Sequence, residues 1–286
     1  MNPRGGSFFE QAQKAEQQGN REGRDLWELY AVHRERLTSA ILDLAPAAGG
    51  GKLGLLGAGN GNDLDLERLA GRFDELHLID IDAAAVARAT NRQKPEVRAK
   101  LRAHAPVDLS GLYRQLDELK PPLPSFDDLV ATGAAAVARQ LPPGFDLAVS
   151  CCMLSQMSWS LTRTIGDEDD DLLALLQQAT VNIHLRTLVA LTPPGRPALI
   201  ASDLVSSDRF PLEEAAAETD LRTLATQIAE QKQAYAVSNP DLMRQILRRD
   251  RTLRDQCGPI EMGEPWLWTG SQERTYLVAP LVLRRR

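Results

Sequence analysis

Three glycines at alternate positions are the residues of this chain whose spacing points most directly to chemistry. Gly57, Gly59 and Gly61 follow the apolar run LGLL at 53–56, and a second apolar run, LHLI, ends at Asp80. A glycine turn after a strand lets a ligand approach the backbone closely, and a carboxylate offers paired acceptor oxygens to a ribose diol. This order of strand, glycine turn, helix, strand and acid predicts the first βαβ unit of a nucleotide-binding fold.

The position of the third glycine separates two classes of ligand. A dinucleotide turn has the spacing GxGxxG and would need a glycine at position 62, where this chain has Asn62. A GxGxG turn fits all three glycines without a mismatch, and it has no pyrophosphate to hold if the ligand is S-adenosylmethionine. The spacing therefore favours S-adenosylmethionine over NAD(P).

The elements that must position this turn alternate between strands and helices. We expect strands at 53–56, 76–81, 100–107, 144–154 and 197–205. Helices are expected at 7–44, 82–94 and 171–191, as two short helices within 109–143, and over 211–256 with a break at Ser238–Pro240. The helix after the glycine turn should start near Asn62 or Asp63. PWLWTGS and ERTYLVAPLVLRR then predict a terminal hairpin. The alternation predicts an α/β fold with a doubly wound, mostly parallel sheet.

With these motifs the chain resembles the class I S-adenosylmethionine-dependent methyltransferases, which are Rossmann-like. The resemblance covers about residues 53–205 and the hairpin at 266–284. It implies a mostly parallel seven-stranded sheet whose antiparallel strand comes from the terminal hairpin. It also implies an N-terminal helical cap, residues 1–50, and a Rossmann-like domain, residues 51–286, that contains a helical lid insert at 206–262.

The resemblance assigns the cofactor contacts residue by residue. Asp80 would accept the ribose hydroxyls, Ile81 would pack on the adenine, and Asp108 with the Leu109 N–H would bind the adenine edge. The cofactor-binding residues implied in this way are Gly57, Ala58, Gly59, Asn60, Gly61, Asp63, Asp80, Ile81, Asp108, Leu109 and Cys151. The alternative interpretation of Asp108 is a cap of the following helix.

One position departs from the family pattern. The family commonly has an acid two residues before the first glycine, where it helps to hold the ammonium group of the cofactor, and this chain has Leu55 there. Asn60, Asn62 or Asp63 are the nearby polar residues that can substitute for that acid. If none does, the chain is a catalytically degenerate binding protein with a methyltransferase fold.

Residues that act on the acceptor are less clearly marked. Methyl transfer is an in-line displacement in which the cofactor brings the electrophile, so a base is needed only when the acceptor keeps its proton. The candidates for a catalytic role are His33, His104 and Gln156, and those for contact with the acceptor are Tyr30, Arg34, Ser155 and Trp159. The plainer interpretation of His33 is a packed helix residue, and that of Cys151 and Cys152 is buried strand residues without an activating group.

The composition narrows the class of partner. A net charge of −6 and a pI of about 5.4 argue against a nucleic acid or an anionic membrane. Three cysteines form no disulfide framework, and no metal-ligand spacing is present; the acidic run at 166–171 is interpreted as a solvated helix start. The chain has no hydrophobic leader and no apolar run long enough to span a membrane, so we expect a cytoplasmic protein.

Taken together, the sequence predicts S-adenosylmethionine-dependent methyl transfer to a small-molecule acceptor, with no metal and an undetermined oligomeric state. The alternatives are the catalytically degenerate binding protein and an NAD(P)-linked oxidoreductase. Asn62 and the terminal hairpin count against the oxidoreductase.

Overall fold

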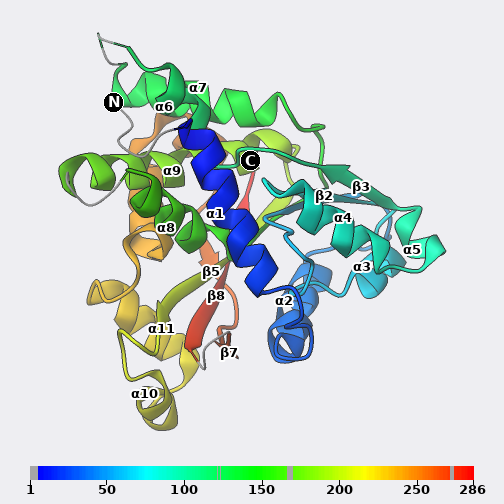
Figure 1. Ribbon diagram of the computed structural model, residues 1–286. Helices are drawn as coiled ribbons and strands as arrows, with labels where there is room; N and C mark the ends of the chain where they lie inside the picture. Colours follow the sequence, from blue (N-terminus) through cyan, green and yellow to red (C-terminus); the bar gives the residue numbers. More distant parts are fainter. Residues whose placement is uncertain (1–5, 121, 123, 166–169, 271–273) are drawn as a thin grey trace.

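A sheet with helices on both sides forms the centre of the computed structural model (Figure 1), which describes residues 6–120, 122, 124–165, 170–270 and 274–286. The strands in these residues are β1 (Lys52–Leu56), β2 (Glu75–Ile79), β3 (Leu101–His104), β4 (Leu147–Cys151), β5 (Pro197–Ser206), β6 (Glu261–Met262), β7 (Trp266–Thr269) and β8 (Thr275–Arg284). Each of the five strands expected before the hairpin is present, and the ends differ by a few residues.

Helices connect the strands and cover them. They are α1 (Phe8–Glu22), α2 (Ala31–Asp43), α3 (Leu66–Arg72), α4 (Ala83–Asn91), α5 (Pro95–Arg98), α6 (Tyr113–Glu118), α7 (Phe126–Ala138), α8 (Met153–Ile165), α9 (Asp170–Leu191), α10 (Leu212–Glu218), α11 (Leu221–Glu230), η1 (Ala236–Ser238, a 3-10 turn), α12 (Pro240–Arg249) and α13 (Arg251–Gln256). The stretch expected to be one helical region at 7–44 is divided into α1 and α2 by a turn.

The strand order confirms the predicted sheet. The order is β3-β2-β1-β4-β5-β8, with β1 to β5 parallel and β8 antiparallel to β5. The short β6 and then β7 pair with successive parts of β8, on the side that β5 leaves free. The two therefore share one edge position, so the sheet is seven strands wide and closes with the antiparallel hairpin of β7 and β8.

The two faces of the sheet bury two separate cores, because successive side chains of a strand point to opposite faces. On β1, Leu53 and Leu55 pack with α2, α3 and α4, whereas Leu56 packs on the other face with α7, α8 and α9. Such strands are buried on both faces and read as continuous apolar runs. Leu55, in the position where the family has an acid, has no exposed surface.

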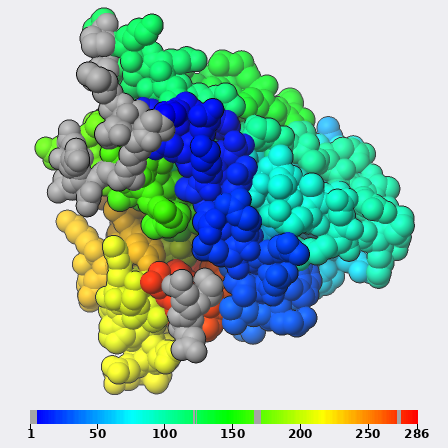
Figure 2. Space-filling model, viewed as in Figure 1, coloured from blue at the N-terminus to red at the C-terminus, as the bar shows by residue number. Residues whose placement is uncertain are grey.

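The ligand crevice of such a sheet lies at the carboxyl ends of the strands, where the strand order reverses. Here the reversal lies between β1 and β4. Helix α1 crosses this end of the sheet (Figure 1), and Figure 2 shows it on the surface across the middle of the same face. The Gln13 side chain donates to the Ile81 carbonyl after β2 (3.2 Å), and the Ser160 hydroxyl of α8 donates to Glu16. The N-terminal helix is thereby held over the crevice.

Two local expectations about helices were wrong. The helix after the glycine turn begins at Leu66 and not near Asn62, because Gly61 has a left-handed backbone (φ +65°) and Asp65 supplies the N-cap by accepting from the Arg68 N–H. Helix α8 was not expected at all. It begins at Met153, two residues after β4 ends at Cys151. Because the first residues of the helix are apolar like those of the strand, the sequence shows no boundary between the two elements.

Candidate active site

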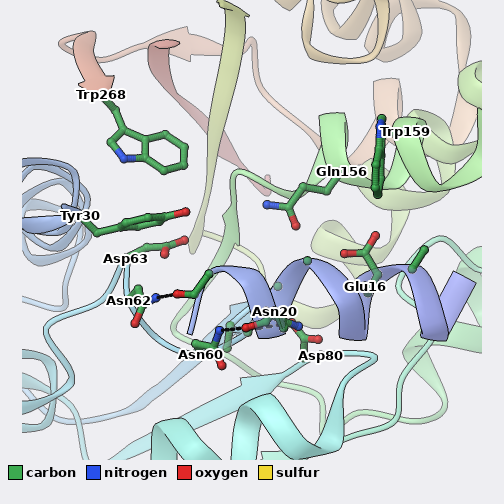
Figure 3. A pocket seen from close by; sticks show the side chains of 16 residues that line it. Glu16, Asn20, Tyr30, Asn60, Asn62, Asp63, Asp80, Gln156, Trp159 and Trp268 are labelled. Carbon is green, nitrogen blue, oxygen red and sulfur yellow. Dashed lines mark hydrogen bonds between the residues drawn. The ribbon is translucent and has the colours of Figure 1, made fainter. Parts of the chain in front are cut away.

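Three adjoining cavities lie at the carboxyl ends of the strands. The first, which we call the turn cavity, is lined by the glycine turn, Asp80 and residues of α1. The second, the apolar cavity, lies towards β3 and is lined by Ile81, Val107 and Asp108 among others. The third, the aromatic cavity, lies towards β5 and β8. Gln156 lines all three, and in Figure 3 its side chain reaches into the space between Tyr30 and Glu16.

The glycine turn has the backbone that its sequence predicts. Gly57 and Gly59 have φ values of +79° and +46°, and both line the turn cavity. A Cβ at Gly57 would lie 3.0 Å from the Cβ of Met153, and one at Gly59 would lie 3.0 Å from the Asn20 side chain. Gly61 lies outside the three cavities, where a Cβ would lie 3.2 Å from that of Ala89 in α4.

Asp80 lies at the end of β2 and closes the floor of the turn cavity. It is 8% exposed, and its two oxygens accept from the Gly59 N–H and the Asp82 N–H, each at 2.8 Å. Burial raises the pKa of this carboxyl to about 6, although the two hydrogen bonds favour the ionised form. Each oxygen keeps a lone pair that can accept from a ligand hydroxyl.

The asparagines of the turn attach α1 to the sheet. The Asn60 side chain donates to the Asn20 carbonyl and that of Asn62 donates to the Gly23 carbonyl, each at 2.7 Å (Figure 3). Their side-chain oxygens accept from Arg88 of α4 and from Arg92 directly after that helix, respectively. Both amides therefore hold α1 to the sheet, while both asparagines and Asp63 line the turn cavity.

Acidic side chains gather around the turn cavity. Glu16 from α1 and Asp63 from the turn line it together with Asp80 (Figure 3). Burial raises the pKa of Glu16 and of Asp63 to about 7 each; Ser160 and Arg34 respectively oppose this rise. Among the described residues, no lysine or arginine lines the turn cavity or the apolar cavity. A cation bound in the turn cavity would stabilise the ionised form of these carboxyl groups.

The apolar cavity is flanked by the ends of β2 and β3. Ile81, Val107 and Leu109 line it, as the resemblance expects for an adenine site. Asp108 also lines it, but its Oδ1 accepts from the N–H and hydroxyl of Ser110, and its Oδ2 accepts from the N–H groups of Tyr113 and Arg114. These four bonds use its lone pairs for the turn before α6, which favours the capping interpretation of Asp108.

The aromatic cavity is assembled from five separate segments. Its aromatic lining residues are Tyr30, Trp159, Tyr235, Trp268 and Tyr276. Cys152, Ser155, Gln156, Asp203, Gly270 and Arg274 complete the wall. It shares four of these residues with the turn cavity, so the two cavities adjoin; the shared residues are Tyr30, Gln156, Trp159 and Trp268.

Asp203 is the one acid of the aromatic cavity among the described residues. It lies on β5 at a break in the register with β8, and it is 5% exposed. The Ser155 hydroxyl donates to its Oδ2 at 2.6 Å, whereas Oδ1 is buried and has no hydrogen-bond partner in the described part of the chain. Burial raises the pKa of this carboxyl to about 7.

Two residues predicted to contact the ligands lie outside the three cavities. Arg34 donates to the Trp27 and Asn62 carbonyls at 2.8 and 3.0 Å, and its guanidinium stacks on the Trp27 ring. His33 is fully buried in the core, and its Nδ1 accepts from the indole N–H of Trp266 (3.0 Å). Burial lowers the pKa of His33 to about 3, so its ring is neutral and supports the wall from behind.

The other outlying candidates are buried or distant. His104 ends β3 and lies 2.9 Å from the ring of His77, away from the three cavities. Cys151 is buried at the end of β4 and lines none of them, and Cys152 lines only the aromatic cavity. Burial raises the pKa of both thiols well above the ordinary value, so neither is an activated nucleophile.

The sequence interpretation missed Glu16, Asn20, Asp203, Arg274 and Tyr276. A charged residue inside the apolar run PALIASDLV was a usable signal for Asp203, because a buried acid in a strand is usually functional or paired. Glu16 gave no such signal, since an acid on an N-terminal helix ordinarily faces solvent. Of the expected lid insert at 206–262, only Tyr235 lines one of the three cavities.

The described residues contain neither an arranged metal site nor a helix that could span a membrane. No group of three or more His, Cys, Asp or Glu side chains there is arranged to hold a metal ion. Most of the acidic run at 166–171 lies outside the described residues. No helix in the described part of the chain is long and apolar enough to cross a membrane.

Comparison with known proteins finds similarity to solved structures. No protein-family profile matches the chain, and no curated protein matches its sequence. The chain is similar to the N-methyltransferase NodS from Bradyrhizobium japonicum WM9, with 16% identity over 92% of this chain and 99% of that one and a TM-score of 0.42. A SAM-dependent methyltransferase from Methanosarcina mazei has 12% identity, 86% and 96% coverage, and a TM-score of 0.45.

An arsenic(III) S-adenosylmethionine methyltransferase from Chlamydomonas reinhardtii has 13% identity, covers 90% of this chain and 73% of its own, and has a TM-score of 0.41. Because similarity is this low, we base the function on the geometry of this chain's own residues. The Rossmann-like fold itself rests on the strand order and connections described above.

Proposed function

We propose that this chain transfers the methyl group of S-adenosylmethionine to a small-molecule acceptor. In this proposal the turn cavity and the apolar cavity together bind the cofactor, and the aromatic cavity binds the acceptor. The observation that carries the proposal is the charge around the glycine turn. Glu16, Asp63 and Asp80 line the turn cavity, and no described lysine or arginine does.

This charge distinguishes the two ligand classes left open by the glycine spacing. S-adenosylmethionine carries a sulfonium and an ammonium group against one carboxylate, so it is a net cation. A dinucleotide would bring a pyrophosphate to the same turn and place its negative charge against three carboxylates. Because like charges in a buried site repel strongly, the acidic lining supports S-adenosylmethionine and opposes NAD(P).

The residues of the cofactor side fit separate parts of the cofactor. Asp80 has a free lone pair on each oxygen for the ribose hydroxyls. Ile81 and Leu109 offer apolar surface to the adenine, and the backbone of the Gly57 turn leaves room for the methionine part. Asp63 is our candidate for the ammonium group, in place of the family acid that Leu55 replaces.

The protein's contribution to the reaction is position and exclusion of water. When bound, S-adenosylmethionine supplies an electrophilic methyl group, and the acceptor must approach it in line with the bond that breaks. Gln156 lines all three cavities, so its amide can hold either ligand at their junction. Helix α1 covers the turn cavity and limits the access of water to it.

Calorimetric titration tests the proposal directly. We expect S-adenosylmethionine and S-adenosylhomocysteine each to bind with one site per chain, and NADH to give no heat of binding. Binding of neither adenosyl compound would sink the proposal, and binding of NADH alone would restore the oxidoreductase. Tight binding of both without formation of S-adenosylhomocysteine from any supplied acceptor would favour the degenerate binding protein.

A further inference from the structure

The walls of the aromatic cavity have a composition that points to one class of acceptor. Five of the eight tryptophans and tyrosines in the chain line this single cavity. They come from the turn before α2, from α8, from the insert and from both strands of the hairpin. Aromatic faces carry partial negative charge and attract ammonium groups. Trp268 stacks on both His33 and Tyr276, so the rings that are not covered in this way, Tyr30 and Trp159 among them, are the ones that can meet a cation.

The carboxyl group of Asp203 lines the same cavity. Oδ2 of Asp203 accepts from the Ser155 hydroxyl, and Oδ1 has no partner among the described residues although it is shielded from solvent. A buried acceptor without a donor costs free energy that a ligand N–H can recover. The Ser155 hydroxyl uses its proton on Asp203, so this part of the wall offers acceptors and no donor.

The arginine side chains near the cavity already have protein partners, and two of them, Arg209 and Arg163, lie over rings that line it, those of Tyr235 and Trp159. Arg274 at its rim lies 3.5 Å from the carboxylate of Asp208, and the guanidinium of Arg209 lies 4.9 Å from the ring centre of Tyr235. Neither is bonded to Asp203 in the described residues. In its ionised form the Asp203 carboxylate therefore has no cationic partner among the described residues and can pair with a positively charged ligand.

We propose that the acceptor is an amine, which binds as an ammonium group to the carboxylate of Asp203 beside the aromatic walls. This inference rests on the proposed function, because it assigns the acceptor for the cofactor in the adjoining turn cavity. It selects amines over phenols, alcohols and carboxylic acids. A carboxylate would be repelled by Asp203, and a neutral hydroxyl would gain nothing from the aromatic faces beyond contact.

The chemistry balances with Asp203 as the base. An ammonium group gives one proton to the Asp203 carboxylate, which becomes a carboxylic acid, and the amine keeps the lone pair. That lone pair forms the new N–C bond with the sulfonium methyl, while the electrons of the breaking C–S bond stay on sulfur and neutralise it. The product is a methylated ammonium, and the proton on Asp203 passes to solvent. No metal or redox partner is required.

Three probes with one carbon skeleton test this inference: phenethylamine, phenethyl alcohol and phenylacetate. Their binding is measured by calorimetry at saturating S-adenosylhomocysteine, using the wild type, Asp203→Asn and Asp220→Asn. We expect the amine to bind at least about tenfold more tightly than the other two probes. Asp203→Asn should abolish this preference, because asparagine keeps an acceptor for Ser155 but has no charge. Asp220→Asn is the matched control, since that acid caps α11 outside the cavity.

Several outcomes overturn the inference. They are equal or tighter binding of the alcohol or acid, no binding of any probe, or an amine preference that survives in Asp203→Asn. Should Asp203→Asn fail to fold, Trp159→Leu serves instead, because this side chain is 51% exposed and lines the cavity. Trp159→Leu should weaken the binding of phenethylamine several-fold and leave that of phenethyl alcohol unchanged. Equal losses of affinity for the two probes would contradict a cation site between the rings.

The cofactor titrations, together with probe titrations repeated without S-adenosylhomocysteine, separate this inference from the proposed function. Binding of S-adenosylmethionine without any amine preference rejects the amine acceptor alone. The opposite result is a protein that binds neither adenosyl compound but still prefers the amine, with a preference that depends on Asp203. That result rejects the methyltransferase proposal instead.

Discussion

The turn cavity and the aromatic cavity differ in charge and in origin. Three acids surround the turn cavity, and two of them, Asp63 and Asp80, belong to the first βαβ unit. The aromatic cavity has a single described acid, Asp203, and walls that come from five segments across the chain. One side is therefore built from a short continuous stretch that suits a cation, and the other is assembled by long-range packing. A cofactor common to many enzymes needs only the first kind of site, whereas an individual acceptor needs the second.

Helix α8 connects the two cavities. Gln156 and Trp159 lie on it and line both, and Ser155 binds Asp203. Four predictions follow from the contrast between the cavities. Each concerns a change that should affect one cavity more than the other.

The largest effect is expected for Asp80→Ala. Loss of the ribose acceptor should weaken S-adenosylmethionine by about 1–3 kcal/mol, roughly 5- to 150-fold in Kd by calorimetry. The control is Asp82→Asn, which removes a charge from the same turn, keeps a good helix cap and lines none of the three cavities. Unchanged affinity in Asp80→Ala, with thermal unfolding as in the control, would refute the ribose contact.

The second prediction concerns pH. Folding raises the pKa of Asp63 from 3.8 to about 7 and that of Glu16 from 4.5 to about 7, so the stability these carboxyls lend to the free protein is present at low pH and lost as pH rises through 7. A cationic cofactor needs the ionised form, and its Kd should fall about tenfold between about pH 6 and 8 for one such group.

Thermal shifts at a series of pH values measure this. The stabilisation that S-adenosylmethionine produces should grow with pH in the wild type and grow less in Asp63→Asn. A stabilisation that is constant or falls with pH would show that the acids around the turn do not bind the cofactor's positive charge.

The third prediction concerns the attachment of α1 to the turn. Asn62→Ala removes the 2.7 Å hydrogen bond to the Gly23 carbonyl and should lower the free energy of unfolding in urea by about 1 kcal/mol. Gln140→Ala removes an exposed hydrogen bond from a side chain just after α7 to the Ala136 carbonyl and serves as the comparison. Equal stability of the two variants would mean that the asparagine of the turn does not hold the helix over the cavity.

The smallest effect on the cofactor side is expected for Tyr235→Leu. Tyr235 lines only the aromatic cavity, so the Kd of S-adenosylmethionine should stay within about twofold of the wild type while phenethylamine binds several-fold more weakly. A loss of cofactor affinity comparable to that of Asp80→Ala would show that the two cavities do not act as separate binding sites.

The fold was predictable where elements repeat a strong local pattern. Apolar runs between breakers identified β1, β2, β4 and β5, and the hairpin of β7 and β8 was evident from its turn. The pattern failed at α8, because an apolar helix directly after an apolar strand leaves no break between the two periodicities. It also failed at α3, where the glycine turn continues for several residues before the cap at Asp65.

The candidate site divided in the same way. Glycine spacing and strand ends identified Gly57, Gly59 and Asp80, which line the turn cavity. Arg34 and His33 were reasonable by residue type, but their partners lie elsewhere in the fold: Arg34 binds main-chain carbonyls and His33 accepts from Trp266. No local pattern states which polar side chain is already paired.

The sequence by itself determined the parallel sheet, the position of the glycine turn and the acid after β2. These depend on neighbouring residues and on the two-residue period of a strand, which are both present in the linear chain. Only the tertiary structure decided that Glu16 of α1 lines the turn cavity, that Leu55 is inaccessible and that Asp203 lines the aromatic cavity with one oxygen unpaired in the described part of the chain. Burial and pairing depend on which distant segments meet, and that is settled by packing across the whole molecule.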